Sequence, residues 1–360
     1  MIERAKPRAT TLTRAAPRPA APPAPKQLVA PFPYFGGKRS VVADVWKRFG
    51  SPAIYLEPFC GSAAMLLGSP TIATTETIND LNCFVANFWR SVKHNADAVV
   101  TWADYPISHI DLGARNAWLR DQADRIGASL QDPNWGGDAQ VAGWWVWGMG
   151  AYIGTGWCDY KAVAEKAPIP RHGRGSVPST ASPTGVHSVG VYDQTSRHAV
   201  GKIPAVGGSG AGVHALPSAE TGGAPAHLLT SAGRNAWATI MVLVNRLERV
   251  NLIHADWTRS LHLPKGHKSI AIFFDPPYKK YEKFYASIRP VAADVEDWCR
   301  EHADLRIALC GHVDDYDLPG WDVMPWKRMG ATYGGTGTQD AECIWFSPAC
   351  LPVANETLFG

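Results

Sequence analysis

Apolar and polar positions follow two different periods along the chain, and segments of the two kinds alternate. Runs rich in apolar and β-branched residues predict strands at 53–57, 70–78, 251–254, 270–274, 305–310 and 342–346. Helical spacing predicts a helix at 82–93 and another at 235–250, whose apolar face is Trp237, Ile240, Met241, Val244, Leu247 and Val250. Strands that alternate with helices predict an α/β fold with a mainly parallel sheet.

The run at 270–274 is apolar at every position, as expected for a central parallel strand that is covered on both faces. It ends in Asp275, Pro276, Pro277 and Tyr278. Prolines commonly end strands and an Asp before Pro often opens a turn, so these residues have an ordinary structural explanation. However, ligands of parallel sheets bind just beyond the carboxyl ends of the strands. This position makes the four residues candidates for chemistry as well.

Two segments lack any periodicity. Residues 1–28 are rich in Pro, Ala and Arg and predict a disordered basic arm. Residues 167–228 are rich in Gly, Pro, Ser, Thr and His, and about sixty residues is too long for an ordinary loop. We therefore expect the blocks 29–93 and 234–360 to form one folded domain, and the intervening 94–233 to form a separate region that contains this insertion.

Composition narrows the class of protein only slightly. The net charge of +3 neither demands nor excludes nucleic acid, and no run of about 18 apolar residues predicts a membrane span. The N-terminus is basic but lacks the apolar core of a secretory signal. Seven scattered cysteines without a C-x-x-C pair indicate free thiols in a reducing compartment and no zinc site. We expect a cytoplasmic protein without a metal.

Three stretches near the start of the folded part are candidates for a cofactor site. Residues 57–61 form a small-residue turn between a strand and a helix, where a ligand can approach the backbone. Upstream, Gly36 and Gly37 permit backbone conformations that other residues avoid, and Lys38 adds a cation. Asp80 ends the second strand, where an acid commonly accepts hydrogen bonds from ribose hydroxyls. Each stretch alone has an ordinary alternative: a tight turn, a loop before a helix, and a helix N-cap.

Taken in order, five motifs resemble those of the Dam-like family of DNA adenine-N6 methyltransferases, of the type common in bacteria and their phages. They are Tyr34-Phe35-Gly36-Gly37-Lys38, Glu57-Pro58-Phe59-Cys60-Gly61, Asp80-Leu81-Asn82, Asp256-Trp257 and Asp275-Pro276-Pro277-Tyr278. The chain departs from the family at Ala63, where a second glycine is usual, which should tighten the turn slightly. Its middle also lacks the target-reading segment of enzymes that recognise GATC, so the recognition sequence stays open.

The resemblance implies a Rossmann-like methyltransferase sheet with an inserted DNA-recognition region at 94–233. It implies S-adenosylmethionine as the cofactor, double-stranded DNA as the partner, and a target adenine that is flipped out of the duplex. Asp275 and the Pro276 carbonyl would accept the two N6 hydrogens, Pro277 would stiffen the turn and Tyr278 would stack on the base. The implied transfer is a direct displacement without a metal or a covalent intermediate.

The resemblance also implies a cofactor site. Tyr34 and Lys38 would lie against the methionine end of the cofactor, Asp80 would hold its ribose, and Asp256 would accept from its adenine amino group. Glu57 would orient the turn. The residues expected to bind the cofactor are Tyr34, Gly36, Gly37, Lys38, Glu57, Phe59, Gly61, Asp80, Asp256 and Asp275.

Other functions remain as alternatives. Cytosine-N4 methyltransferases carry out the same displacement but usually have Ser in place of Asp275. Enzymes that methylate a protein glutamine have Asn in that place. A non-catalytic DNA-binding relative is a third alternative, against which the intact Asp275, Lys38 and Asp80 argue. We expect a monomer or weak dimer in the cytoplasm of a bacterium or a phage-infected host, with or without a cognate restriction enzyme.

Two features of the remaining chain are candidates for DNA contacts. The stretch at 144–157 gathers Trp144, Trp145, Trp147, Tyr152 and Trp157. These side chains form either a stacking surface or, as we prefer, the core of a small subdomain. Lysines after the Asp-Pro-Pro-Tyr motif, and arginines at regular spacing in the recognition region, either hold phosphates or belong to a solvated face. They are Lys279, Lys280, Lys283, Arg115, Arg120 and Arg125.

Overall fold

The computed structural model describes most of the chain outside its low-complexity segments. The described residues are 28–34, 38–152, 157–158, 231–264, 269–278, 291–326 and 342–352. Several sequence predictions lie outside them: those on the arm before residue 28, on Gly36 and Gly37, and on the insertion at 167–228. The three lysines after Tyr278 lie outside them as well.

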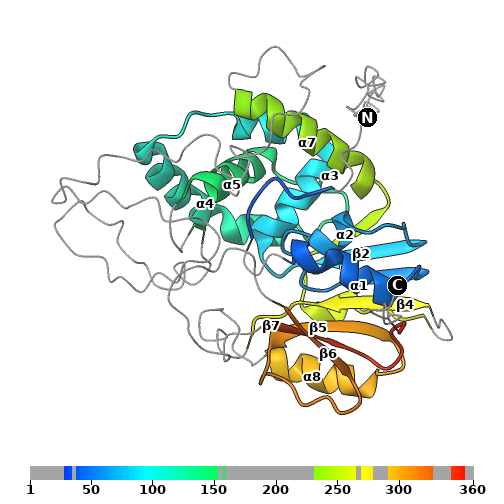
Figure 1. The fold of residues 1–360 in the computed structure, drawn as a ribbon. Coiled ribbons are helices and arrows are strands. Elements are labelled where there is room, and N and C mark those ends of the chain that lie inside the picture. Colours follow the sequence, from blue (N-terminus) through cyan, green and yellow to red (C-terminus); the bar gives the residue numbers. More distant parts are fainter. Residues whose placement is uncertain are drawn as a thin grey trace, which may run out of the picture.

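Within the described residues, a seven-stranded sheet forms the centre of the molecule, in the order β3-β2-β1-β4-β5-β7-β6 (Figure 1). The strands β1 to β5 are parallel to one another, and β7 runs antiparallel to β5 and β6. The bounds are β1 Ile54–Glu57, β2 Thr75–Asn79, β3 Val250–Ile253, β4 Ile270–Phe274, β5 Arg306–His312, β6 Asp322–Trp326 and β7 Glu342–Phe346. The predicted α/β class with a mainly parallel sheet is therefore confirmed.

Helices cover both faces of this sheet. They are α1 Val42–Phe49, α2 Ala64–Leu67, α3 Cys83–Ala103, α4 His109–Ser129, α5 Ala139–Ala151, α7 Ser231–Leu247 and α8 Val291–Glu301, with the short 3-10 helices η1 Arg39–Val41 and η3 Trp257–Ser260. Figure 1 shows α3 and α7 above the sheet and α8 below it. Successive side chains of a strand enter opposite cores: Tyr55 packs with α1 and α3, whereas Leu56 packs on the side of α8.

The sequence pattern was wrong about one strand boundary and one helix end, and it missed one strand. The helix predicted at 235–250 ends at Leu247, and Val250 is the first residue of β3. The strand predicted at 70–78 begins only at Thr75, because Ser69 bonds through its hydroxyl to both backbone groups of Thr71 and forms a turn there. The missed strand is β6, which is mostly exposed and contains Pro325. Edge strands of this kind lack the apolar signal of central strands.

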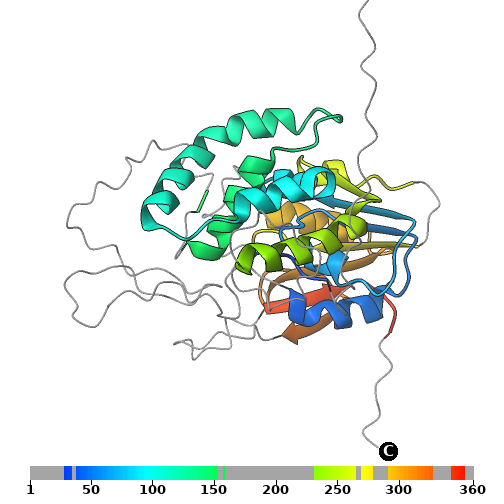
Figure 2. The ribbon, with the colours of Figure 1, turned by 90° about the horizontal axis from the view of Figure 1, so that it is seen from above.

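The recognition region begins inside a helix. The helix α3 crosses the predicted boundary at 93–94 and has a non-helical backbone at Asn95, so it is kinked there. In both views α4 and α5 lie together at one end of the molecule, next to α3 (Figure 2). A side chain at Gly143 would overlap Trp102 and the backbone of Val99, so α5 approaches α3 closely at this point.

The tryptophan-rich stretch forms a core here, as preferred from the sequence. Trp145 and Trp147 are fully buried, and Trp144 is half-buried. The Arg115 guanidinium lies 4.3 Å from the ring centres of Tyr105 and Trp147, inside the same cluster. Arg115 is therefore part of this core, and burial lowers its pKa.

Candidate functional site

The predicted site residues gather at the carboxyl ends of the parallel strands. In the sheet, β1 and β4 are neighbours, and the chain order of the strands reverses between them. Such a reversal leaves a crevice above the sheet where ligands bind. The residues that follow β1 and β4, beginning with Pro58 and Asp275, therefore flank the position where a ligand is expected.

The first and last predicted motifs meet in an ion pair. Lys38 Nζ lies 3.0 Å from Asp275 Oδ1, and the Lys38 side chain is only 3% exposed. Burial lowers the pKa of Lys38, whereas the negative charges of Asp275 and Glu342 raise it. The effect of the charges is the larger, so the pKa of Lys38 lies above its usual value. Burial raises the pKa of Asp275, and the Lys38 ammonium opposes this only in part. The ammonium is thus fixed beside the candidate catalytic carboxylate.

Sequence reasoning missed Glu342 and Trp326, which contact this ion pair, and their neighbour His312. Strand register places Glu342 opposite both His312 of β5 and Trp326 of β6. Glu342 Oε2 lies 3.6 Å from Lys38 Nζ, and the Trp326 ring centre lies 5.4 Å from the same atom. The available signal was an acid that opens an otherwise apolar strand at 342–346, in the same way that Asp275 closes one.

Tyr278 lies within this group of side chains. Its hydroxyl donates to Glu342 Oε2 at 3.2 Å, and Lys38 Nζ lies 5.2 Å from its ring centre. The ring of His312 meets it edge-on at 5.0 Å. Tyr278 is buried, so its predicted stacking on a base, which stays a prediction, requires a face of the ring that these neighbours leave open.

The motif's prolines follow the strand as the sequence predicts. The strand β4 ends at Phe274, directly before Asp275. Pro276 is buried and Pro277 is half-buried. Because neither has an N–H group, this turn offers carbonyl acceptors and no backbone donor at these two positions.

Glu57 connects the end of β1 to the next helix. Its Oε2 accepts hydrogen bonds from the Tyr55 hydroxyl at 3.0 Å and from the backbone N–H of Leu66 at 3.1 Å. Burial raises the pKa of Glu57 to about 8, although these hydrogen bonds oppose the shift. The carboxyl is therefore mainly protonated at pH 7, and its contacts tie the turn at 58–63 to α2.

Gly61 and Asp80 form the centre of the candidate cofactor turn. Asp80 Oδ2 accepts from the Gly61 N–H at 2.8 Å, and its Oδ1 accepts from the Asn82 N–H at 2.8 Å. Burial raises the pKa of Asp80 to about 6, and these two hydrogen bonds oppose the shift. Gly61 has a φ of +45°, and a side chain there would overlap the Tyr34 ring. The fold thus brings Tyr34, Gly61 and Asp80 together, and their role in binding a cofactor stays a prediction.

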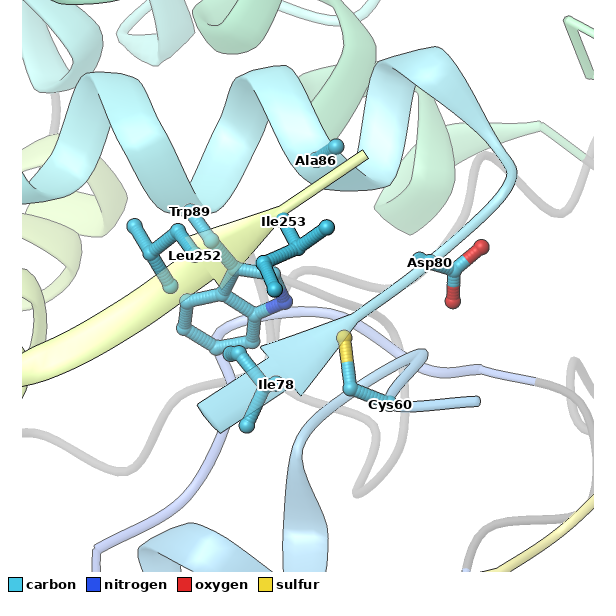
Figure 3. Close-up of a pocket in the computed structure, with 7 residues that line it drawn as sticks. All are labelled: Cys60, Ile78, Asp80, Ala86, Trp89, Leu252 and Ile253. Carbon is cyan, nitrogen blue, oxygen red and sulfur yellow. The ribbon is translucent and has the colours of Figure 1, made fainter. Parts of the chain in front are cut away.

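A small apolar pocket lies behind this carboxylate. It is lined by Cys60, Ile78, Asp80, Ala86, Trp89, Leu252 and Ile253. Figure 3 shows Asp80 to one side of these residues, with its carboxylate directed away from Ile78 and Trp89. The Trp89 indole donates to the Gly61 carbonyl at 2.9 Å and so holds the turn against α3.

Asn79 joins the three strand ends. Its amide nitrogen donates to the Pro58 carbonyl at 2.9 Å and to the Ala255 carbonyl at 3.0 Å. Its oxygen accepts from the Ala255 N–H at 3.0 Å. This buried side chain, which sequence reasoning missed, fixes the turn after β1 relative to the residues after β3.

The other two predicted cofactor residues are Phe59, which belongs to this turn, and Asp256, which follows β3. Asp256 is exposed, and its Oδ1 accepts from the Thr258 N–H at 3.0 Å and caps η3. Phe59 is half-buried, and its ring lies 6.2 Å from that of Trp257 and 6.3 Å from that of Phe274. Phe59 thus packs toward the core on the side of α8.

Ala63, where the family usually has glycine, occupies a left-handed conformation. Its φ is +50° and its ψ is +36°. A residue with a Cβ is disfavoured there by about 1–2 kcal/mol. The turn therefore keeps the backbone that a glycine would favour, and the alanine makes it strained.

Comparison with models of known protein families gives a match near the start of the folded chain. Residues 34–107 match the family model of the D12 class N6 adenine-specific DNA methyltransferases. The matched segment includes Tyr34, Lys38, Gly61 and Asp80, and it ends before Asp275. No curated protein matches the chain.

Two other kinds of feature are absent from the described residues. These residues contain no group of three or more His, Cys, Asp or Glu side chains placed to hold a metal ion. None of their helices combines the length and apolar character needed to cross a membrane.

Proposed function

We propose, on the premise that the chain belongs to the Dam-like family of D12 class N6 adenine-specific DNA methyltransferases, that it methylates adenine N6 in double-stranded DNA with S-adenosylmethionine. DNA adenine methylation follows from the family. The cofactor, the flipped base and the direct displacement are the finer part of the proposal. The observation that carries it is the pairing of Lys38 with Asp275 at the end of β4.

The residues after β1 and β2 fit the proposed cofactor, which supplies an electrophilic methyl group when bound. Gly61 has no side chain at the point where its backbone approaches Tyr34. Each Asp80 oxygen accepts one backbone hydrogen bond, which leaves lone pairs for hydroxyl donors. We assign Tyr34, Lys38, Gly61 and Asp80 to this site, together with Asp256, Gly36, Gly37, Glu57 and Phe59 as the sequence predicts.

Asp275 and Pro276 provide the chemistry that an exocyclic amine needs. The N6 lone pair of adenine is delocalised into the ring, so the nitrogen is a poor nucleophile. A carboxylate that accepts one N6 hydrogen and a carbonyl that accepts the other favour a nitrogen whose lone pair points out of the base plane. The Asp275 charge also stabilises the positive charge that develops on nitrogen during transfer. The two prolines keep these acceptors rigid, which orientation requires.

The target base must leave the duplex before Asp275 can reach it. Stacking of a flipped base on an aromatic ring contributes about 1–3 kcal/mol. We assign this role to Tyr278, whose hydroxyl is held by Glu342. Residues 94–233 remain our assignment for reading the DNA sequence, and a monomer or weak dimer in the cytoplasm remains our expectation.

Transfer of a labelled methyl group tests this proposal. Purified protein is incubated with S-[methyl-³H]adenosylmethionine and genomic DNA from a strain that lacks adenine methylation. We expect label in native DNA and none with Asp275→Ala, provided that this variant still binds the cofactor in calorimetry. Absence of label with the wild-type protein, despite cofactor binding, would contradict the proposal and favour a non-catalytic DNA-binding relative.

A further inference from the structure

Glu342 connects two residues of the candidate site that come from different motifs. Its Oε2 lies 3.6 Å from Lys38 Nζ and accepts from the Tyr278 hydroxyl at 3.2 Å. The Glu342 side chain is 12% exposed, and those of Lys38 and Asp275 are 3% and 19% exposed. All four groups thus interact where water screens their charges only weakly.

This group of side chains contains two carboxylates and one ammonium. The two carboxylates, Asp275 and Glu342, share the ammonium of Lys38. The ammonium lies 3.0 Å from Asp275 and 3.6 Å from Glu342. An ammonium has three donors and can serve both carboxylates at once. Removal of Glu342 takes away one of the two carboxylates that attract Lys38, so the ammonium would turn further toward Asp275.

Such a turn would affect the reaction. Asp275 has to accept an N6 hydrogen, and each additional donor from Lys38 competes for its lone pairs and neutralises its charge. Glu342 also holds the Tyr278 hydroxyl, and the Tyr278 and His312 rings pack in a T-shaped arrangement. The position of Glu342 at the start of β7, across from His312 and Trp326, makes it a rigid anchor for both contacts.

We propose that Glu342 is a positioning residue for methyl transfer, which holds the Lys38 ammonium between two carboxylates and thereby keeps Asp275 able to accept from the target amine. This inference rests on the proposed function. Glu342 itself touches neither substrate nor cofactor in this account. It acts through Lys38 first and through Tyr278 second.

Three substitutions separate these contacts. Glu342→Gln removes the charge that holds Lys38 but keeps an acceptor for the Tyr278 hydroxyl. Tyr278→Phe removes that hydroxyl and keeps the ring. Lys38→Met removes the ammonium. Asp322→Asn is the matched control, because Asp322 lies on the neighbouring β6, is 61% exposed and pairs with Arg48 away from the site.

We expect Glu342→Gln to lower kcat by about tenfold to a hundredfold, while the Kd for S-adenosylmethionine changes less than about threefold. Tyr278→Phe should lower kcat less than Glu342→Gln does, and Asp322→Asn should leave it unchanged. In the Lys38→Met background, Glu342→Gln should have little further effect, because the two residues act as one unit.

Other outcomes overturn the inference. A Glu342→Gln variant whose Tm falls while kcat per folded molecule stays at the wild-type value would show a merely structural residue. Losses that multiply in the double variant would show that Glu342 does not act through Lys38.

Heat unfolding of the same variants tests the coupling between Lys38 and Glu342 without an activity measurement. The Tm changes of Lys38→Met and Glu342→Gln should not add in the double variant. If the wild-type protein transferred no methyl group, the proposed function would fail on that result. Additive Tm changes would overturn the Glu342 inference independently.

Discussion

Lys38 Nζ lies 3.0 Å from Asp275 Oδ1, although the two residues belong to motifs at opposite ends of the folded chain. The pair can form only when the segment before α1 crosses the end of β4. It therefore couples the cofactor half of the site, which begins at Tyr34, to the residues that act on the target amine.

Asp275→Asn should reduce turnover by at least about a hundredfold, because the amide presents less charge to the developing cation and donates where an acceptor is needed. The Kd for S-adenosylmethionine should change little. Single-turnover methylation and calorimetry measure the two quantities. Equal losses of cofactor binding in this variant and in Asp80→Asn would show that the assigned division of roles is wrong.

Asp80→Asn should have the opposite profile. Its two carboxylate oxygens accept from the backbone N–H groups of Gly61 and Asn82, and an amide replaces one of these oxygens with an NH2 donor. We expect the Kd for the cofactor to rise by about tenfold or more, with a smaller change in kcat at saturating cofactor. Unchanged affinity would exclude Asp80 from the cofactor site.

Ala63→Gly should be nearly neutral for stability. Relief of the left-handed strain, about 1–2 kcal/mol, is offset by the lost methyl group and by the flexibility of glycine in the unfolded chain. The adjacent Ala64→Gly, at the first residue of α2, should lose about 1 kcal/mol, because no strain is relieved there. Urea unfolding measures both variants. Equal losses would show that Ala63 is not strained.

Stability should fall as the pH rises from about 4.5 to about 8, through the contribution of Glu57. Burial raises its pKa from the usual 4.5 to about 8 in the folded protein. Within this window the folded state binds a proton that the unfolded state releases, so deprotonation favours unfolding. Asp80 contributes with the same sign between its usual 3.8 and about 6.

Glu57→Gln isolates this contribution, since the amide cannot ionise. Its Tm should depend less on pH than that of the wild-type protein between pH 6 and pH 8. A Tm profile parallel to the wild type over that interval would contradict the raised pKa.

The parts of the site that depend on local sequence patterns could be predicted from the sequence alone. An unbroken apolar run followed by prolines predicted where β4 ends, because a central strand has no polar face and proline cannot continue the ladder. Likewise, the turn at 57–61 and Asp80 follow strands with strong apolar patterns.

The missed residues depend on long-range pairing. Glu342 reaches Lys38 only because β7 returns antiparallel to β5 and aligns Glu342 with His312. Asn79 directly follows the strand predicted at 70–78, and its three hydrogen bonds to the neighbouring strand ends follow from the strand order. The edge strand β6, with Trp326, has too few buried positions to give an apolar signal.

The identity of the methylated nucleoside tests the central claim most directly. DNA labelled by the wild-type protein is digested to nucleosides, which are separated and identified by mass spectrometry. An Asp at position 275 beside Lys38 predicts N6-methyldeoxyadenosine as the labelled product. N4-methyldeoxycytidine as the sole labelled nucleoside would contradict the account, because the same displacement would then act on cytosine despite the Asp-Pro-Pro-Tyr site.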